Sequence, residues 1–423
     1  MTPIKMERFD GSFGLSVEGR WMEQLDGFLN LAKPAGMTSH DCVARVRWLL
    51  KQALKDAASQ AQILDSATTD PQPRQSTGKS GKIKPPKVGH GGTLDPAAIG
   101  VLPIAIGRAT RLLQYLPGTK AYRGTVRFGL TTRTDDLDGD ILTQEPASHL
   151  TLDQIQPHLD QFLGKIEQIP PQYSAIQVDG KRLYDLARRD QLEQVEVPRR
   201  HVEVYRLEVV EWRSGEYPEL VLEIVCGAGT YIRSIARDLG QILGVGATLA
   251  ALTRTQSAGL PLTGSLDLDT IATQVQQHTL ALLPPAQLLS HLPRVQLQPA
   301  QAQDWNQGKR LAWEAVVAPL EPAPLEPAPP SMSPGQLASM QESDNRPSQG
   351  YLDTLQEKAI LQVNTLQSED IVRPGNRVQP DTLLLEDTPL RVETATGQFL
   401  GVGTYRLGAY GYCLQPKVVW GES

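Results

Sequence analysis

The pattern of apolar and polar positions near the start of the chain predicts a strand, a turn and a helix. Residues 27–32 form a short apolar run, which Pro34 and Gly36 end in a turn. The segment that follows, residues 40–54, carries apolar residues at helical spacing, and Thr38 or Ser39 can cap its first turn. The apolar stripe of this helix consists of Val43, Val46, Leu49 and Leu50.

Further along, strands dominate the pattern. Residues 122–130 alternate as a strand does, and residues 200–212 and 219–226 read as two more strands joined by a turn. The glycine-containing segment after Cys226 ends the last of these strands, and a helix is expected to open at Gly229-Thr230. Hairpins mixed with helices predict an α/β (α+β) fold with an antiparallel-rich mixed sheet, flanking helices and more than one domain.

Two polar segments interrupt this pattern. Residues 54–84 end in a Ser, Thr, Pro, Gly and Lys mixture that is too polar to offset its ordering entropy, and we read the second half as a flexible insert. Residues 318–350 begin with a proline-rich near-repeat and read as an extended and then disordered stretch. We therefore divide the chain into an N-terminal extension (1–26), a main domain (27–291) and a β-rich C-terminal domain (292–423).

Composition narrows the class of protein. The net charge of -6 argues against an obligate nucleic-acid binder, yet residues 301–423, with nine basic and fifteen acidic side chains, account for all of it. The three cysteines form no CxxC pair and the seven histidines have no metal-ligand spacing, so neither a zinc site nor a disulfide framework is indicated. This cysteine usage predicts a reduced, cytoplasmic compartment. The apolar runs are too short for a membrane span, and the first residues have no apolar signal core.

The segment Val88–Gly100, VGHGGTLDPAAIG, contains the most informative carboxylate. Nine Lys and Arg residues lie between Lys82 and Arg133, against the single acidic residue Asp95. Such an acid should stay ionised beside its cations, as a nucleophile or base next to a polyanion would. Asp95-Pro96 is also typical of a helix N-cap followed by proline, and the glycines do not match the dinucleotide pattern GxGxxG.

Five segments in order resemble the TruB-type tRNA pseudouridine synthases. They are KPAGMTS, VGHGGTLDPAAIGVLPIAIGRATR, KAYRGTVRFGLTTRTDDLDG, PPQYSAIQVDGKRLYDLAR and GTYIRSIARDLG, and they cover most of residues 27–260. The resemblance implies the pseudouridine synthase core with a mobile thumb at about 170–198. It also implies that residues 292–423 form a PUA-like module that contacts tRNA on the acceptor-stem side, a contact that the acidic balance of this region argues against.

The same resemblance assigns roles to individual residues. Asp95 is the essential aspartate, Arg233 its ion-pair partner, and Tyr122 the ring that stacks on the target base and a candidate acceptor of the C5 proton. His90 helps to extrude the uridine, which lies at position 55 of the T-loop in tRNA. The remaining substrate-binding candidates are Gly91, Thr93, Lys33, Lys120, Arg123 and Leu252.

The isomerisation explains why the reaction needs few catalytic groups. Uracil leaves its N-glycosidic bond, turns over and rejoins the ribose through C5, so no metal and no cofactor is expected. The carboxylate could add to C1′ of the ribose, add to C6 of the ring, or act first as a base at C2′. An apolar floor should retain the detached base, and phosphates should meet basic side chains. Floor candidates are Ile232, Leu249 and Leu252; further phosphate candidates are Arg127, Lys181, Arg182, Arg188 and Arg189.

Three function classes follow from these residues. A pseudouridine synthase would produce an isomer of unchanged mass, a hydrolase with the same carboxylate would release free uracil, and a tRNA-folding chaperone would bind without altering the base. The motifs favour the synthase, with the T-arm and elbow of tRNA as its partner and a monomer as its expected state. A hydrolase usually needs a second acid to activate water, and the sequence places none in evidence near Asp95.

Overall fold

The computed structural model describes residues 25–68, 85–174, 177–178, 181–182, 197–313, 316, 386–408 and 411–421. Contacts divide the chain into two units, residues 1–289 and residues 290–423. Four predicted segments lie wholly or largely outside the described residues: the N-terminal extension, residues 69–84 of the polar insert, most of the thumb with Arg188 and Arg189, and the proline-rich segment 318–350.

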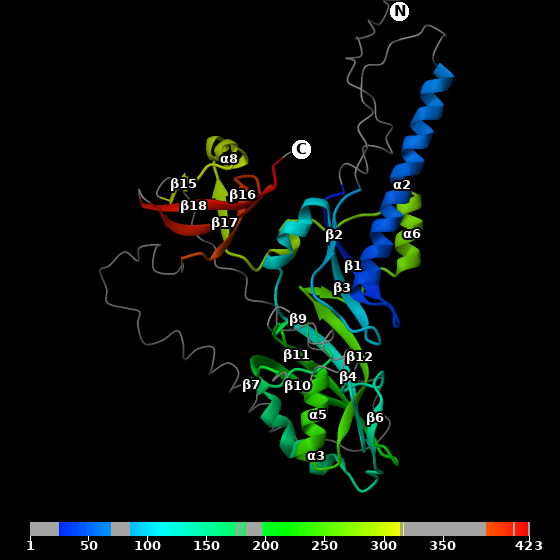
Figure 1. Cartoon of the computed structure of the whole chain (residues 1–423). Helices are drawn as coiled ribbons and strands as arrows, with labels where there is room; N and C mark the ends of the chain where they lie inside the picture. Colours follow the sequence, from blue (N-terminus) through cyan, green and yellow to red (C-terminus); the bar gives the residue numbers. More distant parts are fainter. Residues whose placement is uncertain are drawn as a thin grey trace, which may run out of the picture. The chain divides into compact units, whose positions relative to one another are not determined.

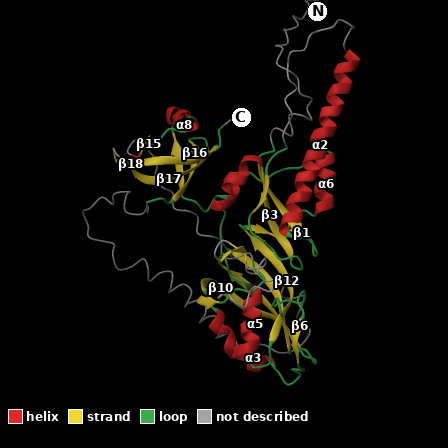
Figure 2. Ribbon diagram, in the orientation of Figure 1, coloured by secondary structure: helices red, strands yellow, loops and turns green. Residues whose placement is uncertain are grey.

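A nine-stranded mixed sheet forms the first unit (Figures 1 and 2). Seven strands follow the order β1-β3-β12-β4-β11-β10-β7, while β2 pairs with β3 and β13 with β12. Among the described strands of this sheet, β12 and β3 form the one parallel pair. The strands are β1 (Gly27–Lys33), β2 (Val88–His90), β3 (Ile99–Ile106), β4 (Lys120–Phe128), β7 (Gly164–Gln168), β10 (Arg200–Arg213), β11 (Glu219–Cys226), β12 (Ala247–Ser257) and β13 (Leu260–Pro261).

Helices and short hairpins surround this sheet. The helices are α2 (Ser39–Thr68), α3 (Leu152–Leu159), α5 (Ile232–Ile242), α6 (Leu268–Gln276) and α7 (Pro285–Leu288), with 3₁₀ turns at Gly107–Tyr115 and Asp160–Phe162. β5 (Leu130–Thr132) pairs with β6 (Ile141–Gln144), and β8 (Gln177–Val178) with β9 (Lys181–Arg182). The antiparallel-rich α+β class expected from the hairpin pattern is therefore confirmed.

Two buried clusters hold the first unit together. One packs α3 and α5 against β4, β11 and β12, and includes Phe128, Ile235 and Leu239. The other packs α2 and α6 against β1 and β3, and includes Val46 and Leu50 from the predicted stripe of α2. The loop between β2 and β3 contributes Leu94 and Ala98 to the first cluster, while the two strands themselves pack in the second.

Helix α2 begins where its sequence predicts but runs further. Thr38 Oγ1 accepts a hydrogen bond from Asp41 N at 3.0 Å, and Asp41 Oδ2 accepts one from Thr38 N at 2.9 Å. This reciprocal pair satisfies two backbone donors at the helix start. The helix continues to Thr68, so the first half of the predicted polar insert is helical. Residues 53–64 contain four Ala, two Gln and two Leu, and these strong helix formers outweigh the lack of an apolar stripe.

Two smaller expectations were wrong. Helix α5 begins at Ile232 with Tyr231 as its N-cap, rather than at Gly229-Thr230. Gly229 instead adopts a φ of +87°, which is not a helical conformation. No helix begins at Asp95 either, because residues 91–98 form an irregular loop.

The second unit has its own sheet and its own core. Five strands follow the order β14-β16-β17-β18-β15, with helix α8 (Pro299–Asn306) packed against them. The strands are β14 (Arg294–Leu297), β15 (Leu311–Ala312), β16 (Pro389–Thr394), β17 (Phe399–Gly408) and β18 (Gly411–Val419). Trp305 is fully buried at the centre, and its indole donates a hydrogen bond to Leu400 O at 2.9 Å.

Candidate functional site

Asp95 lies on the irregular loop between β2 and β3, and this loop is fixed to helix α2. Ser39 Oγ accepts a hydrogen bond from Leu94 N at 2.8 Å and donates one to Leu94 O at 3.0 Å. Leu94 itself is buried in the main core cluster. The residue next to Asp95 is therefore held by both its backbone and its side chain.

Lys33 fixes the other side of the same loop. Its ammonium donates to Pro34 O at 2.8 Å, Pro96 O at 3.0 Å and Ala98 O at 2.7 Å. Only 1% of the residue is exposed, and this burial lowers the pKa of its ammonium. All three donors of Lys33 are used by backbone carbonyls. This geometry favours a positioning role over the substrate contact that the resemblance implies.

Arg254 on β12 is a second buried cation bound to the loop, and the sequence analysis did not single it out. It has no exposed surface. Its Nε donates to Val101 O at 2.7 Å, and its two terminal nitrogens donate to Thr93 O and Gly92 O, both at 3.1 Å. The one sequence feature that could have indicated its role is that Arg254 is the single charged residue in the segment that forms β12.

Arg233 holds two carboxylates. Its Nη2 lies 3.0 Å from Asp95 Oδ2, and its Nε lies 3.6 Å from Asp136 Oδ2. The same guanidinium donates to Thr134 O at 2.9 Å and Tyr173 O at 3.1 Å. The side chain of Arg233 is 5% exposed and that of Asp95 38%. The ion pair that the resemblance implies is thus present, with the carboxylate on the open side.

Asp136 is the second residue that sequence reasoning missed. It lies in the acidic run just beyond the basic stretch around Asp95, and its Oδ1 accepts hydrogen bonds from Thr134 Oγ1 and Asp138 N. The expectation that no second acid lies near Asp95 is therefore wrong. The chain path after β5 brings Asp136 to Arg233, and a count of charges over a sequence window does not reveal such a contact.

Tyr122 lies on β4 directly opposite Arg254 on β12. The residue is 7% exposed, and burial raises the pKa of its phenol to about 12. The charge of Asp95 raises this pKa further, while that of Arg254 lowers it. The phenol therefore carries its proton at neutral pH, which suits a ring that stacks or donates better than a proton acceptor.

The three apolar floor candidates lie together. A Cβ added at Gly124, two residues after Tyr122, would meet Ile232 Cγ2 at 3.3 Å, Leu249 Cδ1 at 3.5 Å and Leu252 Cδ1 at 3.8 Å. Gly124 thus leaves room for these side chains to converge beside the ring. Leu249 and Ile232 are buried, and Leu252 is partly buried against the same cluster.

The other predicted substrate-binding residues lie around the loop. His90 Nδ1 accepts a hydrogen bond from Gly92 N at 3.3 Å, and burial lowers the pKa of its ring. Gly91 N donates to Pro103 O at 2.8 Å, and Thr93 is exposed. The Lys120 ammonium, whose pKa burial also lowers, bonds Gly118 O at 3.2 Å. Arg123 pairs with Glu223 on β11 at 2.7 Å.

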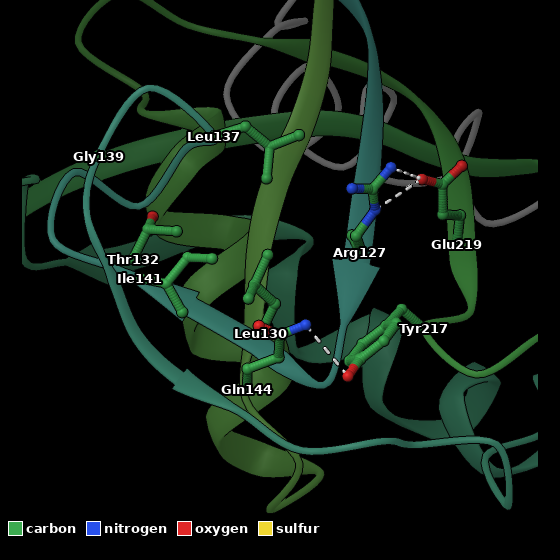
Figure 3. A pocket seen from close by; sticks show the side chains of 9 residues that line it. All are labelled: Arg127, Leu130, Thr132, Leu137, Gly139, Ile141, Gln144, Tyr217 and Glu219. Atoms are coloured by element: carbon green, nitrogen blue, oxygen red, sulfur yellow. Dashed lines mark hydrogen bonds and ion pairs between the residues drawn. The ribbon is translucent and has the colours of Figure 1, made fainter.

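A separate pocket of about 580 Å³ opens beside the β5–β6 hairpin (Figure 3). Arg127 and Glu219 form an ion pair at 2.7 Å on its rim, and Gln144 Nε2 donates to Tyr217 Oη at 3.2 Å. Its remaining lining residues are Leu130, Thr132, Leu137, Gly139 and Ile141. None of the predicted catalytic residues lines this pocket, so it is distinct from the loop that carries Asp95.

Within the described ranges, no group of three or more His, Cys, Asp or Glu side chains is placed to hold a metal ion. No described helix is long and apolar enough to cross a membrane.

Comparison with known proteins gives matches to one family of enzymes, at the level of both a domain model and whole sequences. Residues 80–232 match the model for the TruB family pseudouridylate synthase N-terminal domain. A protein named tRNA pseudouridine synthase B from Trichormus variabilis is 52% identical over 287 residues, covering 68% of this chain and 86% of its own. A protein of the same name from Gloeothece citriformis is 53% identical over 285 residues, covering 67% and 81%.

Solved structures match at the level of the fold. The chain resembles one in the crystal structure of a Cbf5-Nop10-Gar1 complex, with a TM-score of 0.56, 20% identity and coverage of 98% of this chain and 91% of that one. It also resembles one in the structure of an H/ACA RNP bound to a substrate RNA containing 2′-deoxyuridine, with a TM-score of 0.53, 18% identity and coverage of 95% and 87%.

Proposed function

The chain belongs to the TruB family of pseudouridine synthases, and from this premise we propose that it isomerises uridine 55 in the T-loop of tRNA to pseudouridine. We infer the tRNA substrate from the similar proteins named tRNA pseudouridine synthase B. We infer position 55 and the essential role of Asp95 from the resemblance of the motifs around Asp95 to those of the family. The partner surface would be the T-arm and elbow of tRNA.

The observation that carries the proposal is the carboxylate of Asp95, partly open to solvent and held at 3.0 Å by a buried arginine. The isomerisation breaks the N1–C1′ bond and forms a C5–C1′ bond, while the C5 proton leaves and N1 gains a proton. Nothing is added to the substrate or removed from it. An ionised, oriented carboxylate next to the reacting ribose suffices for addition at C1′, for addition at C6 or for proton removal at C2′.

The arrangement around Asp95 suits a flipped-out base. Extruding a base from a stacked loop costs a few kcal/mol. Stacking on Tyr122 would return about 1 to 3 kcal/mol of that cost. The apolar group of Ile232, Leu249 and Leu252 beside the ring supports retention of the detached uracil, because it offers no hydrogen-bond partner that would favour water entry.

We propose that basic groups near the loop, including Lys120 and Arg123, meet the RNA backbone, and that affinity falls steeply with salt. Residues 292–423 would form the PUA-like module, and residues 170–198 the thumb that closes on the T-loop. Because Arg123 and Arg127 pair with Glu223 and Glu219, each would have to exchange a carboxylate for a phosphate on binding. We expect the protein to act as a monomer.

The hydrolase alternative needs a direct test, since Asp136 supplies the second carboxylate near Arg233. Oδ1 of Asp136 accepts hydrogen bonds from Thr134 and Asp138, and Oδ2 is ion-paired with Arg233 at 3.6 Å. This engagement favours a positioning role for Asp136 over activation of water. A chaperone activity could accompany isomerisation, because access to the base requires opening of the tRNA elbow.

The decisive experiment incubates the purified protein with an unmodified tRNA transcript and maps pseudouridine by chemical adduct and primer extension. The parent protein should convert the T-loop uridine, and Asp95→Asn should convert none while binding the transcript as tightly. Asp138→Asn, a change of the same charge at an exposed acid of the neighbouring loop, serves as the control and should remain active. Release of free uracil would support the hydrolase, and full activity of Asp95→Asn would refute the assignment.

A further inference from the structure

Helix α2 presents an exposed row of side chains that the described mechanism does not use. The row consists of His40, Ala44, Trp48, Lys51 and Lys55, all exposed. Successive spacings of four, four, three and four residues place them on one face of the helix. We call this row the α2 stripe. The buried residues of α2, such as Val46 and Leu50, lie on the opposite side.

The α2 stripe begins at the candidate site. The rings of His40 and His90 approach edge to face, with centroids 6.2 Å apart. One residue earlier, Ser39 binds the backbone of Leu94, which precedes Asp95. From His40 to Lys55 the helix rises about 22 Å, at about 1.5 Å per residue. The stripe is therefore continuous with the site at one end and leads away from it.

The chemistry of the stripe is cationic and aromatic. Among the described residues, no carboxylate lies within ion-pair distance of Arg45, Lys51 or Lys55. Trp48 is 48% exposed, and the Arg45 guanidinium carbon lies 4.7 Å from the centre of its ring. An exposed tryptophan costs free energy in water, and uncompensated cations beside it favour an anionic partner with flat, apolar faces.

We propose that the α2 stripe is an RNA-binding surface that holds the ribose-phosphate backbone of the substrate beside the extruded uridine. This inference rests on the proposed function. Lys51 and Lys55 would each neutralise a phosphate, and Trp48, already covered by Arg45 on one face of its ring, would pack its open face against a ribose or base. Lys55 lies about 22 Å along the helix from His40, so the stripe would follow an RNA stem that leads away from the extruded uridine.

The experiment compares the full-length parent protein with Lys51→Gln/Lys55→Gln, using one unmodified tRNA transcript. The dissociation constant of the variant should rise about tenfold at 100 mM salt, since two exposed phosphate contacts are lost. The slope of log affinity against log salt should become shallower by about two units. The single-turnover rate of pseudouridine formation at saturating enzyme should stay within about twofold of the parent rate.

Matched variants separate charge from position. Lys165→Gln/Gln161→Glu removes one positive charge and adds one negative charge, so it changes the net charge by the same two units. Both positions are exposed, in and beside β7, at the opposite edge of the sheet from β1, and this variant should bind like the parent. Lys51→Arg/Lys55→Arg keeps the charge and should restore affinity. Trp48→Ala should weaken binding about fivefold without changing the salt slope, because stacking releases no counterions.

Parental affinity and slope in Lys51→Gln/Lys55→Gln, or equal losses in the β7 control, would overturn the inference. Equal weakening by the Gln and Arg pairs would overturn it too, since charge would then not be the cause. A slower rate at saturation with unchanged affinity would place these lysines in the reaction instead. If the parent binds tRNA but forms no pseudouridine, the proposed function fails, and the affinity and salt measurements still decide whether the stripe binds RNA.

Discussion

Arg233 binds Asp95 and Asp136 through different nitrogens, so its removal leaves two carboxylates without their shared cation. The Asp95 side chain would then lose the contact that fixes its orientation. A misplacement of about 1 Å at a reacting group can cost about 100-fold in rate. We predict that Arg233→Lys and Arg233→Ala lower the single-turnover rate at saturating tRNA by at least about 100-fold, with a change in affinity below about threefold.

The next arginine along the same face of α5 provides the control for this prediction. Arg237 pairs with Asp135 at 2.9 Å and Asp238 at 2.8 Å and does not contact Asp95. Arg237→Lys should keep most of the rate if the effect belongs to the pair with Asp95. Rapid-quench measurement of pseudouridine and a filter-binding isotherm give the two quantities. Equal losses of rate and affinity in Arg233→Lys would contradict the assigned role.

The buried phenol of Tyr122 makes a pH prediction. Burial disfavours the phenolate and raises the pKa of Tyr122 to about 12, so the phenolate is present in about one molecule in 10,000 at pH 8. A reaction that required this phenolate would accelerate about tenfold per pH unit. We predict instead that the single-turnover rate is constant within about twofold from pH 7 to pH 9.

Substitution of Tyr122 tests the stacking role in the same assay. Tyr122→Phe keeps the ring and should bind tRNA within about threefold of the parent. Tyr122→Ala loses the ring and should bind at least about fivefold more weakly, the lower end of the usual stacking contribution. A tenfold rise in the parental rate per pH unit, absent in Tyr122→Phe, would show that the phenolate is the base.

The sequence predicted the residues of the site unevenly. Asp95, Tyr122, His90 and Arg233 were singled out by their motifs, and the ion pair of Arg233 with Asp95 is present. Asp136 and Arg254 were missed, because their importance comes from contacts with residues more than 90 positions away. Lys33 was identified, but its three carbonyl partners depend on the fold of the loop and not on any local pattern.

The close approach of β12 to the site loop depends on Gly100. This residue has a φ of +110°, and a Cβ there would lie 2.3 Å from Arg254 O and 2.8 Å from Arg254 N. Neither backbone atom can withdraw without breaking the parallel pairing of β12 with β3. We predict that Gly100→Ala lowers the free energy of unfolding by about 3 kcal/mol or more, since strain and overlap add.

Gly164 offers the matched control for Gly100. Its φ is +76°, and nothing lies within 4 Å of the Cβ position. Gly164→Ala should therefore cost only the strain of the left-handed backbone, about 1 kcal/mol. Urea unfolding of both variants gives the comparison. A cost for Gly100→Ala no larger than that for Gly164→Ala would mean that the loop and β12 separate more easily than these contacts indicate.

Among the elements, strands were predicted better than helix boundaries. The segments 200–212 and 219–226 became β10 and β11 with nearly the predicted limits, β10 largely exposed or partly buried and β11 mostly buried. Helix α2 was cut short in the prediction because its apolar stripe ends near Ala57, although its residues keep a high helix propensity beyond that point. The start of α5 was misplaced, because Thr230 bonds Gly227 O in a turn before the helix begins.

The two units of the chain have separate hydrophobic cores, so damage to one core should leave the other intact. Trp305 is fully buried in the second unit, and Leu239 is fully buried against α3 and the sheet in the first. Truncation of a buried tryptophan or leucine to alanine typically costs about 2 to 5 kcal/mol. The charge of the chain is divided in the same way, since the net charge of -6 arises after residue 300.

We predict two thermal transitions, each sensitive to one core. Trp305→Ala should lower the temperature of one transition and leave pseudouridine formation at 25 °C within about twofold of the parent rate, because every proposed catalytic group belongs to the first unit. Leu239→Ala should lower the other transition and the temperature at which activity is lost, since Leu239 follows Arg233 on α5. Calorimetry and an activity-against-temperature profile measure both effects. If either substitution shifts both transitions by the same amount, the units unfold as one, and the second unit then stabilises the catalytic core in addition to any contact it makes with tRNA.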